Sequence, residues 1–175
     1  MSNGARVIVI RHGIAEDAEA AARAGTPDAQ RALTGAGLRK LRRAAAGLRS
    51  LEPQLAAIGH SPLRRTRETA EALAAFWPGV GCQPLPALAP GGDAAGVLAW
   101  VADYRDGIPV ALVGHEPDLG EWIARAVSGE PGPGFPLRKA GMACIEFPDR
   151  VRFGEGRLRW LLQPKQLRRL ASESG

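Results

Sequence analysis

Long apolar runs are missing from this chain of 175 residues. A helix that crosses a bilayer needs about 20 consecutive apolar residues, and no stretch of the sequence approaches that length. The first apolar stretch, residues 7–10, is also too short for the core of a signal peptide and runs straight into Arg11. We therefore expect a cytoplasmic protein without a membrane partner.

Cysteine is scarce as well. The two cysteines, Cys82 and Cys144, lie far apart and match no spacing typical of a metal site or a redox motif. Cys144 stands in an apolar run, where a cysteine usually behaves as a small buried hydrophobe. We expect both to be reduced and structural, although the sequence alone leaves one disulfide open. No cluster of metal ligands is visible, and no cofactor is expected.

Aromatic residues form only 5% of the chain, which bears on its positive charge of +5. The basic residues are spread along the sequence, and of the four tryptophans only Trp160 stands among them. A stacking platform for nucleic acid is therefore not indicated. The charge suits phosphorylated, acidic substrates, although a chain rich in arginine can carry it without a dedicated partner. We expect no nucleic-acid partner.

Short β-type runs alternate with helical patterns along the chain, which is typical of a layered α/β domain. The apolar and charged fractions, 45% and 23%, are those of ordinary globular proteins. Neither a repeat nor a linker divides the sequence. We predict one α/β/α domain over residues 1–175, with a core over about 6–170 and a mostly parallel central sheet flanked by helices.

The expected elements can be placed from periodicity and capping residues. Strands are expected at residues 6–10, 55–59, 83–85, 109–113, 142–147 and 157–162. Helices are expected to begin at the N-caps Thr34, Ser61 and Asp93, after Pro117, and near Lys165. Pro62 then takes the first position of the second helix.

Two of the three histidines follow predicted buried strands directly. His12 leaves the first strand between Arg11 and Gly13, and His115 leaves the fourth after Gly114. Because ligands of open α/β sheets bind at the carboxyl ends of the strands, both histidines can face one ligand. A lone histidine is more often a satisfied loop or core residue, but two in equivalent positions favour a site.

Arginines gather at the same predicted positions. Arg11 adjoins His12, Arg64 and Arg65 fall in the first turn of a helix, and Arg31 precedes another helix. A helix N-terminus favours anions, and an arginine there can clamp a phosphate with two hydrogen bonds. Each arginine alone could be a solvated surface residue; their placement with the histidines indicates a phosphate site.

Four motifs in order resemble those of the histidine phosphatase superfamily, the phosphoglycerate mutase-like proteins. The first is VIRHG at residues 9–13, and the others are RALTGAG at 31–37, SPLRRTRETA at 61–70 and VGH at 113–115. The SixA-type branch of phosphohistidine phosphatases is further indicated by LAPGGD at 88–93 and WLLQP at 160–164. The resemblance covers about residues 6–170.

This resemblance implies a role for each motif residue. It implies that His12 is the nucleophile and that Arg11 and Arg65 hold the phosphoryl oxygens; the family arginine is the fourth residue after the serine, hence Arg65. It also implies that His115 donates to the phosphoryl group and that Arg31 is a further phosphate-side arginine. The chemistry agrees, because imidazole is both a nucleophile and a leaving group, and arginines stabilise the charge without a metal.

One motif departs from the wider superfamily. Many members carry a glutamate as proton donor in the loop that corresponds to residues 85–90, where this chain has Ala87, and Ile14 stands where mutase-like members often have glutamate. Asp93 is a possible general acid, although a helix cap is its more common role. Weaker candidates are Glu16, Asp17, Glu116 and Asp118, with His60 at the rim.

The favoured function is hydrolysis of phosphohistidine in proteins, for example in a histidine phosphotransfer domain. A first alternative is a metal-independent phosphatase for small phosphate esters or nucleotides. A second is a non-catalytic module that binds phosphoprotein, against which the set of His12, Arg11, Arg65 and His115 argues, because a pure reader needs no nucleophile.

Overall fold

The computed structural model describes residues 4–173 and contains one six-stranded sheet in the order β3-β2-β4-β1-β5-β6. The strands are β1 (Ala5–Arg11), β2 (Ile58–His60), β3 (Cys82–Pro84), β4 (Val110–Gly114), β5 (Met142–Phe147) and β6 (Arg157–Leu162). The helices are α1 (Ala18–Arg23), α2 (Gly35–Leu51), α3 (Arg64–Ala74), α4 (Ala94–Ala102), α5 (Asp118–Ser128) and α6 (Pro164–Glu173). Two short 3₁₀ turns, η1 (Asp28–Gln30) and η2 (Pro86–Leu88), complete the set.

The sheet is mixed. Strand β1 pairs in parallel with β4, and β2 pairs in parallel with β3 and β4, whereas β5 runs antiparallel to β1 and β6. Parallel strands therefore form one half of the sheet and an antiparallel pair closes the other edge. The expected α/β fold with helices around a mostly parallel sheet is confirmed.

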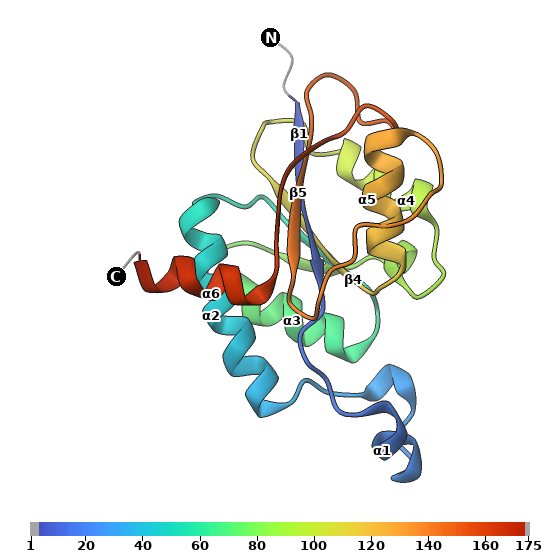
Figure 1. Cartoon of the computed structure of the whole chain (residues 1–175), viewed down its shortest axis with the longest axis vertical. Coiled ribbons are helices and arrows are strands. Elements are labelled where there is room, and N and C mark those ends of the chain that lie inside the picture. The colour runs from blue at the N-terminus through green and yellow to red at the C-terminus, as the bar shows by residue number, and fades with distance from the viewer. Residues whose placement is uncertain (1–3, 174–175) are drawn as a thin grey trace.

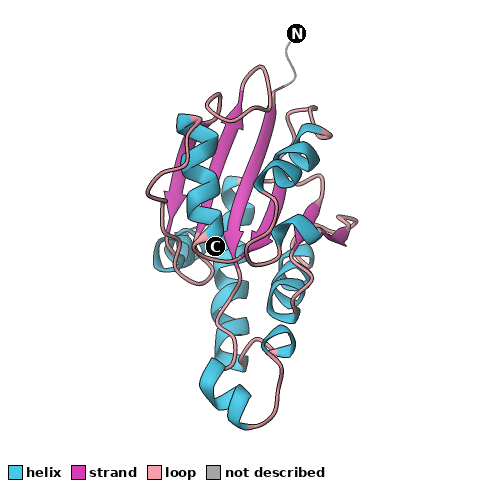
Figure 2. Cartoon of the chain, turned by 90° about the vertical axis from the view of Figure 1, so that its right-hand side faces the viewer, coloured by secondary structure: helices cyan, strands magenta, loops and turns pink. Residues whose placement is uncertain are grey.

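Strand β1 shows why the fold has three layers. Its side chains alternate between two cores: Val7 and Val9 pack with α4 and α5, while Ile8 and Ile10 pack with α2, α3 and α6. All four are fully buried, as expected of a strand covered by helices on both faces. The two helical layers are visible on either side of the sheet in Figures 1 and 2.

Helix α2 is capped as the sequence predicts and is crossed closely by α6. The Thr34 side chain accepts a hydrogen bond from the Gly37 backbone N–H at 2.9 Å. A Cβ atom at Gly47 would collide with the Leu167 carbonyl, so a glycine is required where the two helices cross. The buried Leu167 fills the core beneath this crossing.

Three elements differ from expectation. Helix α3 begins at Arg64, with Leu63 rather than Ser61 as its N-cap; the Ser61 hydroxyl oxygen accepts from the Leu63 N–H at 3.4 Å and also lies 2.8 Å from the His115 Nε2. Strand β2 begins at Ile58 rather than at residue 55. Residues 16–30, where the sequence predicts no element, hold α1 and η1 and project beyond the sheet at the bottom of Figure 1; Asp17 caps α1 by accepting from the Ala20 N–H.

Both cysteines are free thiols, as expected. Burial raises the pKa of Cys144 to about 11, which keeps this thiol protonated and inert. None of the helices within residues 4–173 is long and apolar enough to cross a membrane.

Candidate active site

The two histidines meet at the carboxyl ends of β1 and β4. These strands are paired so that Arg11 lies opposite Gly114, and the His12 backbone N–H donates to the Gly114 carbonyl at 3.1 Å. The imidazole rings of His12 and His115 therefore lie side by side, with 5.3 Å between their centroids. The two histidines thus lie together at the strand ends, as their positions in the sequence predict.

Three arginines surround the histidine pair. Arg11, Arg31 and Arg65 line the same pocket as His12 and His115. The side chain of Arg65 is 6% exposed, whereas that of Arg64 is 42% exposed and pairs with Glu68 at 2.7 Å. Within residues 4–173 the Nε atoms of Arg11 and Arg65 are buried without a hydrogen-bond partner, so neither guanidinium group has all of its donors satisfied by the protein.

A backbone hydrogen bond orients the His12 ring. Its Nδ1 lies 2.7 Å from the Gly13 carbonyl oxygen, and a carbonyl only accepts, so Nδ1 carries the proton and Nε2 keeps its lone pair. Burial lowers the pKa of His12 from 6.5 to about 3, and the nearby His115, Arg65 and Arg11 act in the same direction. The imidazole is therefore neutral at pH 7, the state in which it is a nucleophile.

His115 is held in the complementary way. Its Nε2 lies 2.8 Å from the Ser61 hydroxyl, and its Nδ1 faces the Arg65 Nη2 at 3.5 Å. A guanidinium only donates, so Nδ1 accepts and Nε2 carries the proton. Burial lowers the pKa of His115 to about 4, assisted by Arg65. A phosphoryl dianion beside Nδ1 would oppose both effects and favour the protonated, donating ring.

Asp28 links two of the arginines. Its carboxylate pairs with Arg65 Nη1 at 3.2 Å and with Arg31 Nε at 2.8 Å. Slight desolvation works to raise the pKa of Asp28, but the bonds from Arg31 and Arg65 outweigh it and hold that pKa below its ordinary value. Arg31 also donates to the Glu16 carbonyl at 2.7 Å. Asp28 thus fixes the guanidinium groups before any substrate arrives.

Helix α3 is tied directly to the loop of the first histidine. The Gly13 backbone N–H donates to the Thr69 hydroxyl at 3.0 Å, and this hydroxyl donates to the Arg65 carbonyl at 2.7 Å. Thr69 is fully buried. One side chain therefore couples the positions of His12 and Arg65.

The segment from Pro136 to Ala140 forms a strap across the end of β1. The Arg11 Nη1 donates to the Leu137 carbonyl at 2.9 Å, and the Leu137 N–H donates to the Glu116 carboxylate at 3.1 Å. The Ala140 N–H bonds both the Arg11 and His12 carbonyls at 3.1 Å. The strap thus orients Arg11, and burial of its support, Glu116, raises the pKa of that carboxyl group.

Comparison with known proteins agrees with this geometry. The sequence profile of the histidine phosphatase superfamily (branch 1) matches residues 7–89, the part that carries His12, Arg31 and Arg65. The chain belongs to the histidine phosphatase superfamily. It is a phosphatase of the kind that uses a histidine nucleophile, and its structure is similar to those of the SixA branch.

Solved and curated relatives resemble this superfamily member over most of their length. The protein histidine phosphatase SixA, solved with tungstate, is 26% identical with a TM-score of 0.76, covering 93% of this chain and 99% of SixA. A candidate SixA from Agrobacterium tumefaciens is 27% identical with a TM-score of 0.67, covering 91% and 98%. An uncharacterized protein of Picosynechococcus is 39% identical over 134 residues, 75% of this chain and 79% of its own.

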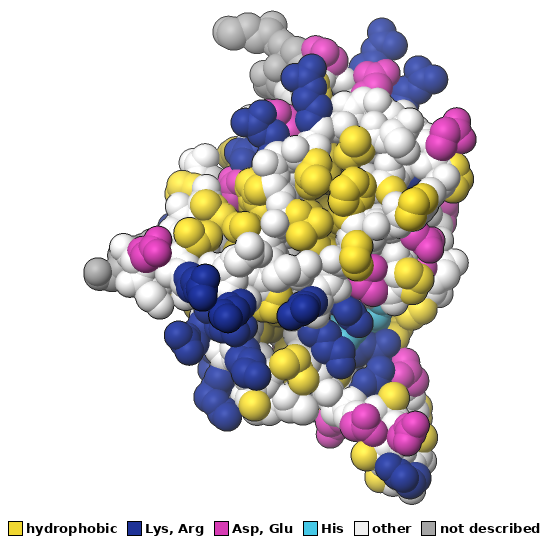
Figure 3. All heavy atoms as spheres, in the orientation of Figure 1, with side chains coloured by type: hydrophobic (Ala, Val, Ile, Leu, Met, Phe, Trp, Pro, Cys, Tyr) yellow, Lys and Arg dark blue, Asp and Glu magenta, His cyan; other side chains and the backbone are white. Residues whose placement is uncertain are grey.

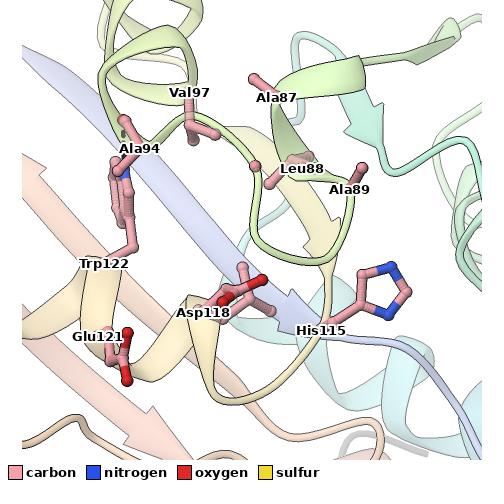
Figure 4. Close-up of a pocket in the computed structure, with 11 residues that line it drawn as sticks. Ala87, Leu88, Ala89, Ala94, Val97, His115, Asp118, Glu121 and Trp122 are labelled. Carbon is pink, nitrogen blue, oxygen red and sulfur yellow. Dashed lines mark hydrogen bonds between the residues drawn. The ribbon is translucent and has the colours of Figure 1, made fainter.

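The loop that often supplies an acid in the superfamily contributes none here. Ala87, Leu88 and Ala89 line a neighbouring apolar pocket behind His115 (Figure 4), and only Pro90 of this loop reaches the catalytic pocket. Asp93 does not line the catalytic pocket; its carboxylate caps α4 by accepting from the Ala95 N–H at 3.0 Å. The structure therefore separates Asp93 from the histidine pair.

Of the other acidic candidates, one lies in the apolar pocket and three line the catalytic pocket. Asp118 lies in the apolar pocket and accepts from the Gly91 N–H at 2.7 Å. Glu16, Asp17 and Glu116 line the catalytic pocket, but each accepts a backbone N–H bond. His60 is buried outside that pocket, with its Nδ1 2.8 Å from the Ser61 carbonyl.

Sequence reasoning missed three residues of the site: Asp28, Thr69 and Lys139. Thr69 lies four residues after Arg65 on one helix, so it shares a face with that arginine, and this spacing was a usable signal. Asp28 begins η1 and stands three residues before its partner Arg31, a spacing that was also a usable signal, whereas Lys139 lies far from His12 in the sequence and no local pattern places it in the pocket.

Proposed function

We propose that this protein removes the phosphoryl group from phosphohistidine in proteins, by way of a phosphohistidine intermediate on His12. The observation that carries the proposal is a neutral His12 with a free Nε2, set among Arg11, Arg31 and Arg65 in a pocket whose carboxylates all serve other partners. The similarity to SixA, a protein histidine phosphatase, supports the same substrate class.

The first step transfers the phosphoryl group. The His12 Nε2 attacks phosphorus while the bond from phosphorus to the substrate imidazole breaks, and its electron pair stays on the leaving nitrogen. Arg11, Arg31 and Arg65 balance the charge on the phosphoryl oxygens in the transition state. The dianion raises the pKa of His115, whose Nδ1 then takes a proton from solvent and donates to one of those oxygens.

The second step regenerates the enzyme. Water attacks phosphorus, the bond from phosphorus to the His12 Nε2 breaks, and inorganic phosphate leaves with the proton lost by the water. His12 returns to the neutral tautomer that the Gly13 carbonyl favours. Splitting one displacement into two in this way lowers each barrier, because imidazole serves first as nucleophile and then as leaving group.

The leaving group argues for phosphohistidine over an alkyl ester. An alkoxide has a high pKa and needs a positioned acid to protonate it. An imidazole whose other nitrogen is protonated can depart as a neutral ring without such an acid. In this pocket Glu16, Asp17 and Glu116 accept backbone hydrogen bonds and Asp28 pairs with arginines.

Glu116 gives the small-ester alternative its one specific support. Burial raises the pKa of this carboxyl group, and it lines the pocket beside His115, so a protonated Glu116 could serve an alkoxide leaving group. A binding module without catalysis has no comparable support, because it gives no reason for a free His12 Nε2.

Turnover of three substrates decides between these functions. We expect kcat/KM to fall in the order phosphohistidine peptide, p-nitrophenyl phosphate and alkyl phosphate, with the alkyl phosphate nearly inert. If alkyl and aryl phosphates turned over equally and Glu116→Gln abolished only the alkyl reaction, the small-ester function would replace this one. Absence of turnover with all three would leave the binding module. The fitting partner is a phosphorylated cytoplasmic protein such as a histidine phosphotransfer domain.

A further inference from the structure

A basic groove adjoins the catalytic pocket. Five cations line it: Arg11, Lys40, Arg138, Lys139 and Arg168. Arg11 and Lys139 line the catalytic pocket too, so the groove and the pocket share a wall. Lys40 comes from α2, Arg168 from α6 and the other two from the strap, and the fold thus gathers charges that are far apart in the sequence.

These cations are not neutralised by the protein itself. Within residues 4–173 no acidic side chain lines the groove, and none of the five takes part in an ion pair. Lys40, Arg138 and Lys139 are exposed, and Arg168 is half-buried. Uncompensated like charges in one groove repel each other and attract an anionic partner.

Hydrogen bonds hold the backbone that carries two of the groove's cations. The Gln163 side chain accepts from the Arg138 N–H at 2.9 Å and donates to the Pro136 carbonyl at 3.1 Å. The Gly141 N–H closes a turn onto the Arg138 carbonyl at 2.6 Å. The strap therefore holds the backbone of Arg138 and Lys139 at a fixed place beside Arg11.

The two sides of the catalytic pocket carry opposite charge. Acidic Glu16, Asp17 and Asp28 stand on the α1 side, and the basic groove lies toward α2 and α6. Figure 3 shows Lys and Arg side chains gathered over the region of α2 and α6, next to a histidine that is visible from outside. A phosphorylated side chain on a protein surface can thus enter the catalytic pocket while neighbouring residues of that protein contact the groove.

We infer that this groove docks an acidic stretch of the phosphoprotein substrate, next to the phosphorylated side chain; this rests on the proposed function and specifies its partner. Protein suits the groove better than nucleic acid, because Ile14, Ala140 and Pro164 are its apolar lining and it offers no aromatic ring for stacking. An acidic stretch of the substrate is attracted by the groove and repelled by the acidic residues on the α1 side, so the substrate docks in one direction.

Four synthetic peptides test the inference. Each carries one phosphorylated residue, either phosphohistidine or phosphotyrosine, flanked either by glutamates or by the isosteric glutamines. The ratio of kcat/KM for glutamate over glutamine flanks measures the preference for acidic flanks that the groove should give. The ratio for phosphohistidine over phosphotyrosine measures the proposed function, so each can fail without the other.

The decisive variant is the triple Lys40→Glu, Arg138→Glu, Arg168→Glu, which leaves Arg11 and Lys139 in place. We expect the wild type to favour glutamate flanks about tenfold at low salt, through KM, as a few exposed ion pairs of ordinary strength would give. The triple variant should lose this preference and still hydrolyse p-nitrophenyl phosphate within about twofold of wild type. High salt should weaken the preference, because it screens exposed charges.

Arg42→Glu is the matched control. Arg42 is exposed on α2, as Lys40 is, but lines a different groove with Arg64 and Glu68. Reversing the charge of Arg42 should therefore keep the glutamate preference. A wild type without preference, or equal losses on p-nitrophenyl phosphate and peptides in the triple variant, would overturn the inference. So would a single-stranded RNA that inhibits more strongly than the unphosphorylated glutamate peptide and loses this effect in the triple variant.

Discussion

The Nδ1 of His12 lies 2.7 Å from the carbonyl oxygen of Gly13, the residue that follows it. This contact leaves Nε2 of His12 as the free ring nitrogen, and it requires no second side chain. A catalytic carboxylate is therefore not needed to select the tautomer. The consequences of a neutral, buried histidine pair can be measured.

Stability should fall in mild acid because of the two histidines. Their folded pKa values, about 3 for His12 and about 4 for His115, lie below the ordinary 6.5. As the pH falls below 6.5, the unfolded chain binds protons that the folded protein refuses. Each histidine should therefore lower the free energy of unfolding by up to about 1.4 kcal/mol per pH unit, until the pH reaches its folded pKa.

Urea unfolding of His12→Gln and wild type between about pH 7 and pH 5 tests this sign. The variant lacks one of the two buried groups, so its stability should depend less steeply on pH, and its unfolding curves near pH 5 should move toward those at pH 7. An unchanged slope in both His12→Gln and His115→Gln would mean that neither histidine is held neutral by burial.

The nucleophile itself can be trapped. Brief mixing with an aryl phosphate and an alkaline quench should leave phosphate on His12, labile to acid and stable to base, as read by mass spectrometry of the peptide. His12→Ala should lose several orders of magnitude in kcat, the scale seen when a covalent nucleophile is removed. Retained turnover in that variant would rule out the proposed intermediate.

Two adjacent arginines provide a matched pair. Arg65→Ala should lower kcat/KM about a hundredfold or more, as expected for the loss of one donor to the transition state. Arg64→Ala should change it little, because that side chain pairs with Glu68 outside the pocket. Steady-state kinetics on p-nitrophenyl phosphate compares them, and equal losses would contradict the roles given to the two.

Thr69 should act on catalysis through position alone. Thr69→Val leaves the buried Gly13 N–H without its acceptor, which costs about 1–3 kcal/mol of stability. It also frees the His12 loop from α3, so we expect kcat to fall about tenfold with little change in KM. Thr69→Ser keeps the hydroxyl and should retain most of the activity; an active Thr69→Val beside an inactive Thr69→Ser would show that only packing matters.

The sequence predicted the strands β1, β4 and β5 because they are buried on both faces and read as apolar runs. It also placed His12 and His115 together, since strand ends in parallel neighbours meet at one edge. It misplaced the start of α3, which begins at Arg64, and it gave no sign that the Ser61 hydroxyl, which accepts from the Leu63 N–H, also contacts His115, which is distant in the sequence. Lys139 and the basic groove depend on contacts between distant segments, which local patterns do not encode.

The contact of Asp28 with Arg31 and Arg65 has a consequence for turnover. A pocket of bare arginines would hold inorganic phosphate, the product, as firmly as it holds the substrate. Here a resident carboxylate already satisfies part of both guanidinium groups and competes with any free oxyanion for them. A tethered substrate gains additional contacts outside the pocket, whereas free phosphate does not. We therefore expect the protein to release its product readily and to be only weakly inhibited by inorganic phosphate.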